Sequence, residues 1–212
     1  MSSYSDAFGR NVALGMSAAA YSNSPEECIA RIFPNSGKLV RQVEVDCDDS
    51  GSPCAGFIAV DTASKMIIVA FRGSGGFIQL IIEGADEIFG NQVPFIGGKV
   101  ASYFLNAFSL VWNNGLKDAF LSTKNIYPNY GVFITGHSLG GAMAALAAGA
   151  ISTNGLAQPS DITLMTMGEP RTGNSDFVYY FDRLGIEAYR ITHNRDIVVH
   201  LPPEGFNYYQ HA

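Results

Sequence analysis

Ser138 stands at the centre of the segment GHSLG, residues 136–140, which fits the pattern Gly-x-Ser-x-Gly. The apolar residues 132–135 predict a buried strand, and the alanine-rich residues 140–151 predict a helix. A tight turn between them needs small flanking residues and exposes the central hydroxyl, while the Leu139 amide lies at a helix N-terminus that favours negative charge. This pattern predicts a serine nucleophile beside an oxyanion donor. The alternative is a chance match in a chain with 23 glycines.

A carboxylate and a base are needed as well, because a serine hydroxyl is a poor nucleophile at neutral pH. In one common chain order the acid follows the serine, beyond the end of a later strand. Asp196 fits this order, since it lies in the segment HNRDIVVHLPP after a strand predicted at 187–192. Asp161 precedes its strand and Asp176 opens a helix, so both fit less well. The alternative for Asp196 is an ion pair with a neighbouring arginine that orders its loop.

The elements that must position these residues alternate along the chain. Besides the strand before the serine, strands are expected at 39–46, 55–61, 66–73, 162–168 and 187–192. Helices are expected from 98 to about 124 and from 174 to 184, and the N-terminal segment has an amphipathic pattern. This order predicts an α/β fold with a mixed, mostly parallel central sheet and flanking helices. A length of 212 residues suits one core, and residues 1–212 are expected to form a single domain.

The composition excludes several classes of protein. A formal net charge of −6 argues against binding to nucleic acid and against electrostatic binding to anionic membranes. No run of apolar residues is long enough to cross a bilayer, so no transmembrane segment is expected. The histidines and cysteines lack ligand spacing, so neither a metal nor an organic cofactor is implied.

Five segments together resemble the class 3 lipases, a family that includes secreted fungal triacylglycerol lipases and nematode lipase-like proteins. They are MSAAAYSNSPEEC, VAFRGSGG, ITGHSLGGAMAALAA, MGEPRTGN and RITHNRDIVVHLPP, and the likeness is greatest to the nematode group. The resemblance implies an α/β-hydrolase-type fold, with Ser138 as the nucleophile and Asp196 as the triad acid. It also implies an extracellular protein that hydrolyses acylglycerol esters at a lipid–water interface, without a cofactor.

The resemblance assigns an oxyanion hole and a lid. The oxyanion donors are Ser74 and Leu139, and Ser74 directly follows a predicted buried strand, although an ordinary turn serine would do the same. The lid of the family corresponds to the segment after Ser74, whose large apolar residues are Phe77, Ile78, Leu80, Ile81 and Ile82. Opening such a lid exposes apolar surface, which water opposes and lipid favours. The alternative for this segment is a buried core helix.

The cysteines indicate where the sequence departs from the family. Cys47 and Cys54 could close the short segment CDDSGSPC, and the alternative is that all three cysteines are reduced. The resemblance implies that the 47–54 pair is local. It also implies that the counterpart of Cys28 bonds a cysteine in a C-terminal segment that this sequence lacks.

The general base is the missing part of the predicted triad, because the resemblance places the catalytic histidine in that same C-terminal segment. Each of the four histidines present has another explanation, and His211 is the least constrained of them. The sequence is therefore consistent with a truncated form of an active lipase or carboxylesterase. It is also consistent with a catalytically impaired short isoform that binds lipid or acts as a regulator, and with another serine hydrolase, such as a peptidase or thioesterase.

Overall fold

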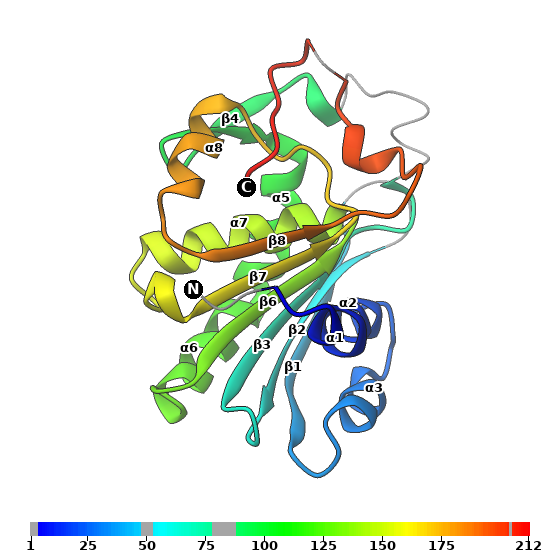
Figure 1. Ribbon diagram of the computed structural model, residues 1–212, viewed down its shortest axis with the longest axis vertical. Helices are drawn as coiled ribbons and strands as arrows, with labels where there is room; N and C mark the ends of the chain where they lie inside the picture. The colour runs from blue at the N-terminus through cyan, green and yellow to red at the C-terminus, as the bar shows by residue number, and fades with distance from the viewer. Residues whose placement is uncertain (1–3, 48–52, 78–87, 204) are drawn as a thin grey trace.

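The computed structural model describes residues 4–47, 53–77, 88–203 and 205–212, and its centre is a six-stranded sheet (Figure 1). In spatial order the strands are β1 (Gly37–Val45), β2 (Cys54–Asp61), β3 (Met66–Arg72), β6 (Gly131–His137), β7 (Ile162–Met167) and β8 (Glu187–Ile191). The first three strands pair antiparallel, and β3, β6, β7 and β8 pair parallel. The predicted α/β fold with a mixed, mostly parallel sheet is confirmed.

Helices cover both faces of this sheet (Figure 1). One face carries α1 (Asp6–Phe8), a π-helical segment (Gly9–Ala13), α2 (Leu14–Ala19) and α3 (Pro25–Ile32). The other face carries α5 (Ser102–Val111), a π-helical segment (Trp112–Leu116), α6 (Lys117–Ile126), α7 (Leu139–Thr153) and α8 (Ser175–Asp182). Short 3₁₀ turns, η3 (Pro159–Asp161) and η4 (Val198–His200), precede β7 and follow β8.

Each face of the sheet has its own hydrophobic core, which explains why the central strands are apolar at nearly every position. On β3, Ile67 and Val69 pack in the core that contains α5 and α7, whereas Ile68 and Ala70 pack beneath α2 and α3. Because side chains alternate between the two faces, a strand covered on both sides has no polar positions. All eight residues of β2 are buried for the same reason.

The prediction of one helix from 98 to about 124 is wrong in two places. Gly98–Ala101 forms β5, which pairs antiparallel with β4 (Gln92–Phe95) in a separate two-stranded sheet. The helix then begins at Ser102 and is broken at Gly115, whose φ of 118° lies outside the helical region. The apolar spacing was helical throughout, but spacing does not register the positive φ that a glycine can adopt.

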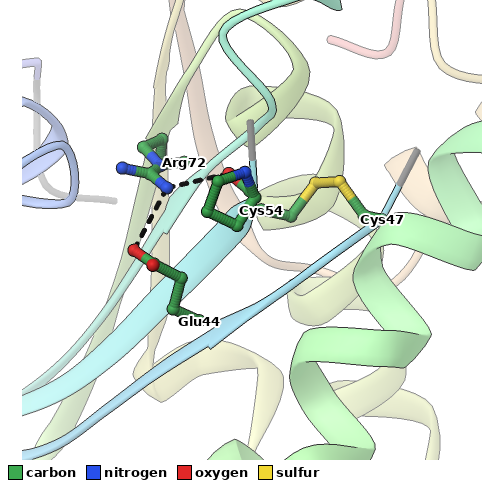
Figure 2. The surroundings of a disulfide bond; sticks show 5 residues. Glu44, Cys47, Cys54 and Arg72 are labelled. Atoms are coloured by element: carbon green, nitrogen blue, oxygen red, sulfur yellow. Dashed lines mark hydrogen bonds and ion pairs between the residues drawn. A yellow bond between two sulfur atoms is a disulfide. The ribbon is translucent and has the colours of Figure 1, made fainter. Parts of the chain in front are cut away.

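A disulfide joins Cys47, just after β1, to Cys54, the first residue of β2 (Figure 2). The two Cα atoms are 5.7 Å apart, within the usual range for a disulfide. Cys28 is a free, half-buried thiol on α3. Among the described residues, no helix has the length and apolar character that a membrane span requires.

Phe120 and Ile126 on α6 offer a matched test of this packing. Phe120 is completely buried against the sheet, whereas Ile126 is 69% exposed at the end of the same helix. We expect Phe120→Ala to lower the free energy of unfolding by about 3–5 kcal/mol, because it removes a buried ring and leaves a cavity. Ile126→Ala should change it by less than about 0.5 kcal/mol. Urea unfolding of both variants measures the difference, and equal losses would contradict the assignment of the core.

Candidate functional site

The backbone at Ser138 has the strained conformation of a strand-to-helix elbow. Its φ of 56° and ψ of −126° lie where non-glycine residues rarely occur, and α7 begins at the next residue. A Cβ on Gly136 would lie 2.1 Å from the carbonyl oxygen of Gly140, and one on Gly140 would lie 2.4 Å from that of Phe71. Both glycines are therefore required by backbone-to-backbone contact, as expected for a tight strand-to-helix turn around a nucleophile.

Ser138 lies in a small cavity together with both predicted oxyanion residues. The cavity has a volume of about 180 Å³ and is lined by Tyr21, Gly73, Ser74, Gly75, Phe77, His137, Ser138 and Leu139. The Ser138 amide is used by the fold, since it donates to the carbonyl oxygen of Met167 at 2.9 Å. The serine is 9% exposed, so its surroundings are largely dry.

The residues predicted as oxyanion donors line the same cavity, and the residue before Ser74 packs on Leu139. A Cβ on Gly73 would lie 2.3 Å from the Cβ of Leu139, so the turn before Ser74 packs directly on the start of α7. Ser74 is 6% exposed, and its hydroxyl has no hydrogen-bond partner among the described residues. A buried hydroxyl without a partner is uncommon and calls for an explanation, and binding of a charge that forms only during reaction is one.

Asp196 lies at the same edge of the sheet as Ser138. The last residues of β6, β7 and β8 are paired in register: His137 with Met167, and Met167 with Ile191. The residues that follow these strands therefore leave the sheet at the same edge. Oδ1 of Asp196 accepts from the Val198 amide at 2.9 Å. Oδ2 approaches the β7 end so closely that a Cβ on Gly168 would lie 2.7 Å from it.

The competing explanations for the candidate acids can now be compared. Among the described residues, Asp196 forms no ion pair with Arg190 or Arg195, so the loop-ordering pair is not present. Asp161 precedes β7, at the opposite edge of the sheet from Ser138, and Asp176 lies in the first turn of α8. Asp196 therefore shares the edge of the nucleophile, whereas Asp161 does not.

The prediction that His211 is the least constrained histidine is wrong. It is 2% exposed, and its Nε2 donates to both carboxylate oxygens of Glu169 at 3.0 and 3.2 Å. His137 Nδ1 and the Tyr21 hydroxyl are hydrogen-bonded at 3.0 Å. Burial lowers the pKa of His137, and the nearby negative charge of Asp196, which acts to raise that pKa, only partly offsets burial. His193 and His200 are exposed. Within the described parts of the chain, no histidine is hydrogen-bonded to the Ser138 hydroxyl.

Sequence analysis missed the role of Glu169, which is buried directly after the Gly168 turn. Besides His211, it accepts hydrogen bonds from the hydroxyls of Thr166 at 2.7 Å and Thr172 at 2.9 Å. Burial alone would raise the pKa of Glu169, but the charge and hydrogen bonds of His211 outweigh burial and hold that pKa below its ordinary value. The only local indication of this role in the sequence is the pair Thr166 and Thr172, which lie three residues before and after Glu169. The network ties residue 211 to the edge that carries Asp196.

Phe77 is the one predicted lid residue that the structure describes. It is 1% exposed, and its ring stacks on Tyr103 with 6.0 Å between centroids and contacts Phe104 at 5.9 Å. The other predicted lid residues, Ile78, Leu80, Ile81 and Ile82, lie outside the described residues. Phe77 therefore connects the cavity to the core around α5. In the described ranges, no group of three or more potential ligands could hold a metal ion.

Comparison with known proteins relates this chain to one family. The sequence profile described as Lipase (class 3) matches residues 68–206. The Caenorhabditis elegans protein Lipase ZK262.3 is 39% identical over 191 residues, which cover 89% of this chain and 53% of that protein. The chain thus spans about half the length of this curated relative.

Solved structures are similar over nearly the whole chain. A lipase from Rhizopus microsporus var. chinensis superposes with a TM-score of 0.83 at 31% identity and covers 98% of this chain and 73% of its own. A triacylglycerol lipase whose catalytic centre is described as a serine protease triad superposes with a TM-score of 0.81 at 29% identity. That alignment covers 98% of this chain and 79% of the other.

Gly136→Ala tests the elbow, and Gly131→Ala at the start of the same strand is its control. The added Cβ at 136 meets backbone at 2.1 Å, whereas at 131 the nearest atom is 3.6 Å away. We expect Gly136→Ala to lower the free energy of unfolding by about 1–3 kcal/mol or more, and Gly131→Ala to change it by under about 0.5 kcal/mol. Thermal and urea unfolding measure both effects. A Gly136→Ala protein as stable as the control would show that the turn relaxes freely.

The Glu169–His211 pair predicts a defined pH window of stabilisation. The pKa of Glu169 lies below its ordinary 4.5, so its contribution is present above that pH and is lost as the pH falls through the lowered pKa. The charge of Glu169 outweighs burial and raises the pKa of His211 above its ordinary 6.5. That contribution is present below 6.5 and is lost as the pH rises through the raised pKa. The pair therefore stabilises most between 4.5 and 6.5.

The measurement is the free energy of unfolding across this range for wild type and Glu169→Gln. The variant should lose most stability inside the window and little outside it. The fixed positive charge of Arg190, which also faces Glu169, remains in both proteins. His200→Asn, at an exposed histidine, is the control and should keep the wild-type profile. A uniform loss at every pH would argue against a charged pair.

Proposed function

Because the chain belongs to the class 3 lipase family, we propose that the protein hydrolyses the carboxylic esters of acylglycerols through an acyl-enzyme on Ser138. The observation that carries this proposal is the cavity in which Ser138 meets Ser74 and Leu139. A nucleophile and two candidate oxyanion donors in one dry pocket suit acyl transfer, whose transition state develops charge on a single oxygen. A solved relative described as a triacylglycerol lipase with a serine triad supports the substrate class.

In the proposed mechanism the Ser138 hydroxyl attacks the ester carbonyl carbon and passes its proton to a histidine. The oxygen of the tetrahedral intermediate is bound by the amides of Ser74 and Leu139 and by the Ser74 hydroxyl. Asp196 orients the histidine and stabilises its charged form. The histidine then protonates the leaving alcohol, and water attacks the acyl-enzyme to release a carboxylic acid and restore the serine.

We infer that this histidine is supplied by the part of the family's length that the chain does not span, since the match covers 53% of the nematode relative. Support comes from the four histidines present, since none is hydrogen-bonded to Ser138 in the described residues and His211 is committed to Glu169. Asp196, which would orient that histidine, lies against Gly168 at the end of β7, the strand whose Met167 carbonyl oxygen accepts from the Ser138 amide.

The apolar surroundings of the cavity support a lipid substrate. Phe77, at the start of the proposed lid, lies between the cavity and the aromatic rings on α5. We propose that residues 77–82 cover the site in water and open at a lipid–water interface, where exposure of apolar surface no longer costs about 25 cal/mol per Å². An extracellular location is part of the proposal, and the Cys47–Cys54 disulfide supports it because disulfides persist in oxidising compartments.

A second candidate function is that of an impaired lipase-like protein that binds lipid or regulates an active relative. The absence of a histidine bonded to Ser138 in the described residues favours it. Without a base, the oxyanion donors and binding alone would leave a residual rate far below that of a complete triad. The two functions differ in turnover and in labelling by a fluorophosphonate, which needs an activated serine.

The test compares this chain with a version extended by the corresponding C-terminal segment of the nematode relative. We expect the extended protein to hydrolyse short and long acyl esters. Ser138→Ala and Asp196→Asn should each lower kcat on the order of 10⁴-fold, because they remove the nucleophile and the group that orients the base.

Asp161→Asn, at the opposite edge of the sheet, is the matched control and should keep the wild-type kcat. Hydrolysis that survives Ser138→Ala would overturn the proposal. An extended protein that binds lipid vesicles but turns over no ester would favour the second candidate.

A further inference from the structure

Arg72 is the last residue of β3 and directly precedes the Gly73–Ser74 turn. Its backbone pairs with Ala55 on β2 and with His137 on β6, the residue before the nucleophile. A Cβ on Gly140 would lie 3.0 Å from the Arg72 Cα, so the backbone here also contacts the first turn of α7. Arg72 therefore connects the Ser74 turn to the strand and the helix that flank the nucleophile.

The side chain of Arg72 reaches the hairpin that the disulfide closes (Figure 2). Its Nη2 donates to the Pro53 carbonyl oxygen at 2.8 Å and to Glu44 Oε2 at 3.3 Å. Pro53 immediately precedes Cys54, and Glu44 lies near the end of β1, three residues before Cys47. Both acceptors therefore belong to strand ends whose spacing the Cys47–Cys54 bond restrains.

The same guanidinium also contacts the cavity wall. Its Cζ lies 5.9 Å from the ring centroid of Tyr21, within the range of a cation–π interaction. Tyr21 lines the cavity and hydrogen-bonds His137 at 3.0 Å. Arg72 therefore lies between the disulfide-closed hairpin on one side and Tyr21, His137 and Ser74 on the other.

Stability alone explains this arrangement poorly. The Arg72 side chain is 13% exposed, and its buried Nε has no partner among the described residues. Desolvation of a charged group costs free energy that one exposed partner such as Glu44, at 47% exposure, repays only in part. An apolar side chain of similar length would fill the space without that cost. What it could not do is hold the end of β3 at a set distance from two acceptors.

We propose that Arg72 is a positioning residue, which fixes the Gly73–Ser74 turn and Tyr21 against Ser138 by anchoring β3 to the disulfide-closed hairpin. The Cys47–Cys54 bond then acts on the site through Arg72. This inference rests on the proposed function, because it gives Ser74 and Ser138 their roles. Removal of the Arg72 guanidinium should lower kcat and change KM little, because the oxyanion donors bind the transition state more strongly than the substrate.

The kinetic test uses the extended protein and a soluble short-chain ester. Arg72→Met should lower kcat by about 10–100-fold, the scale expected when donors are misplaced by roughly 1 Å, with KM within about twofold. Arg72→Lys should recover part of the loss, because an ammonium keeps the charge and the capacity to donate but lacks the planar guanidinium that packs beside Tyr21. Arg41→Met, at an exposed arginine on β1, is the control and should keep the wild-type kcat.

A second readout does not depend on turnover. In the 212-residue chain, with no measurement of hydrolysis, the double substitution Cys47→Ser/Cys54→Ser should shift the amide NMR signals of Gly73, Ser74 and Leu139. The same double substitution in an Arg72→Met background should leave those three signals unmoved, because the connection is already broken. If Arg72→Met does not fold, Arg72→Lys replaces it, and the three signals should then move less than they do in the wild-type background.

The outcomes separate this inference from the proposed function. Hydrolysis that survives Ser138→Ala defeats the proposed function, and the amide shifts then decide the positioning role by themselves. Amide shifts that are the same with and without Arg72 overturn the inference, as does an Arg72→Met protein whose kcat is within twofold of wild type. A loss of melting temperature with unchanged kcat also overturns it, since it shows a structural role only.

Discussion

The close contact of backbone with backbone around the elbow is the constraint on which the rest of the structure depends. Ser138 keeps its strained φ of 56° because Gly136 and Gly140 let β6, α7 and the end of β3 approach without intervening side chains. The register of the parallel strands then brings the ends of β6, β7 and β8 to one edge. The candidate nucleophile, acid and oxyanion donors are neighbours because these few backbone positions are tightly packed.

Two devices support that edge from outside. The buried Glu169–His211 pair holds the segment at residue 211 against the turn after β7, beside the loop that carries Asp196. On the other side, Arg72 joins the end of β3 to a hairpin closed by a disulfide. Both place a charged group in a dry environment, where its partners must be well aligned to offset desolvation. The edge is therefore held in place by polar contacts whose formation requires desolvation of charged groups.

Local sequence patterns predicted the structural features that depend on neighbouring residues. The apolar run before Ser138 and the small residues after it predict the elbow, and the position of Asp196 after a late strand predicts its edge. The Glu169–His211 contact joins residues that are 42 positions apart, and the sequence around either residue does not predict that the two meet. The break at Gly115 and the strand at Gly98–Ala101 were missed because a helical apolar spacing persists where the backbone leaves the helix. Tertiary contact, not propensity, decided these cases.

The mixed sheet has a consequence for the order in which the molecule assembles. β1, β2 and β3 form a meander of neighbouring segments, whereas β3 pairs with β6, from Met66–Gly131 to Arg72–His137, across a long intervening stretch. Closing that stretch costs chain entropy, so the parallel pairs should form after the meander. Until they do, Ser138 and Ser74 belong to separate folding units. A nascent or partly unfolded chain thus does not yet bring Ser138 and Ser74 together, so the proposed esterase activity would report completed folding.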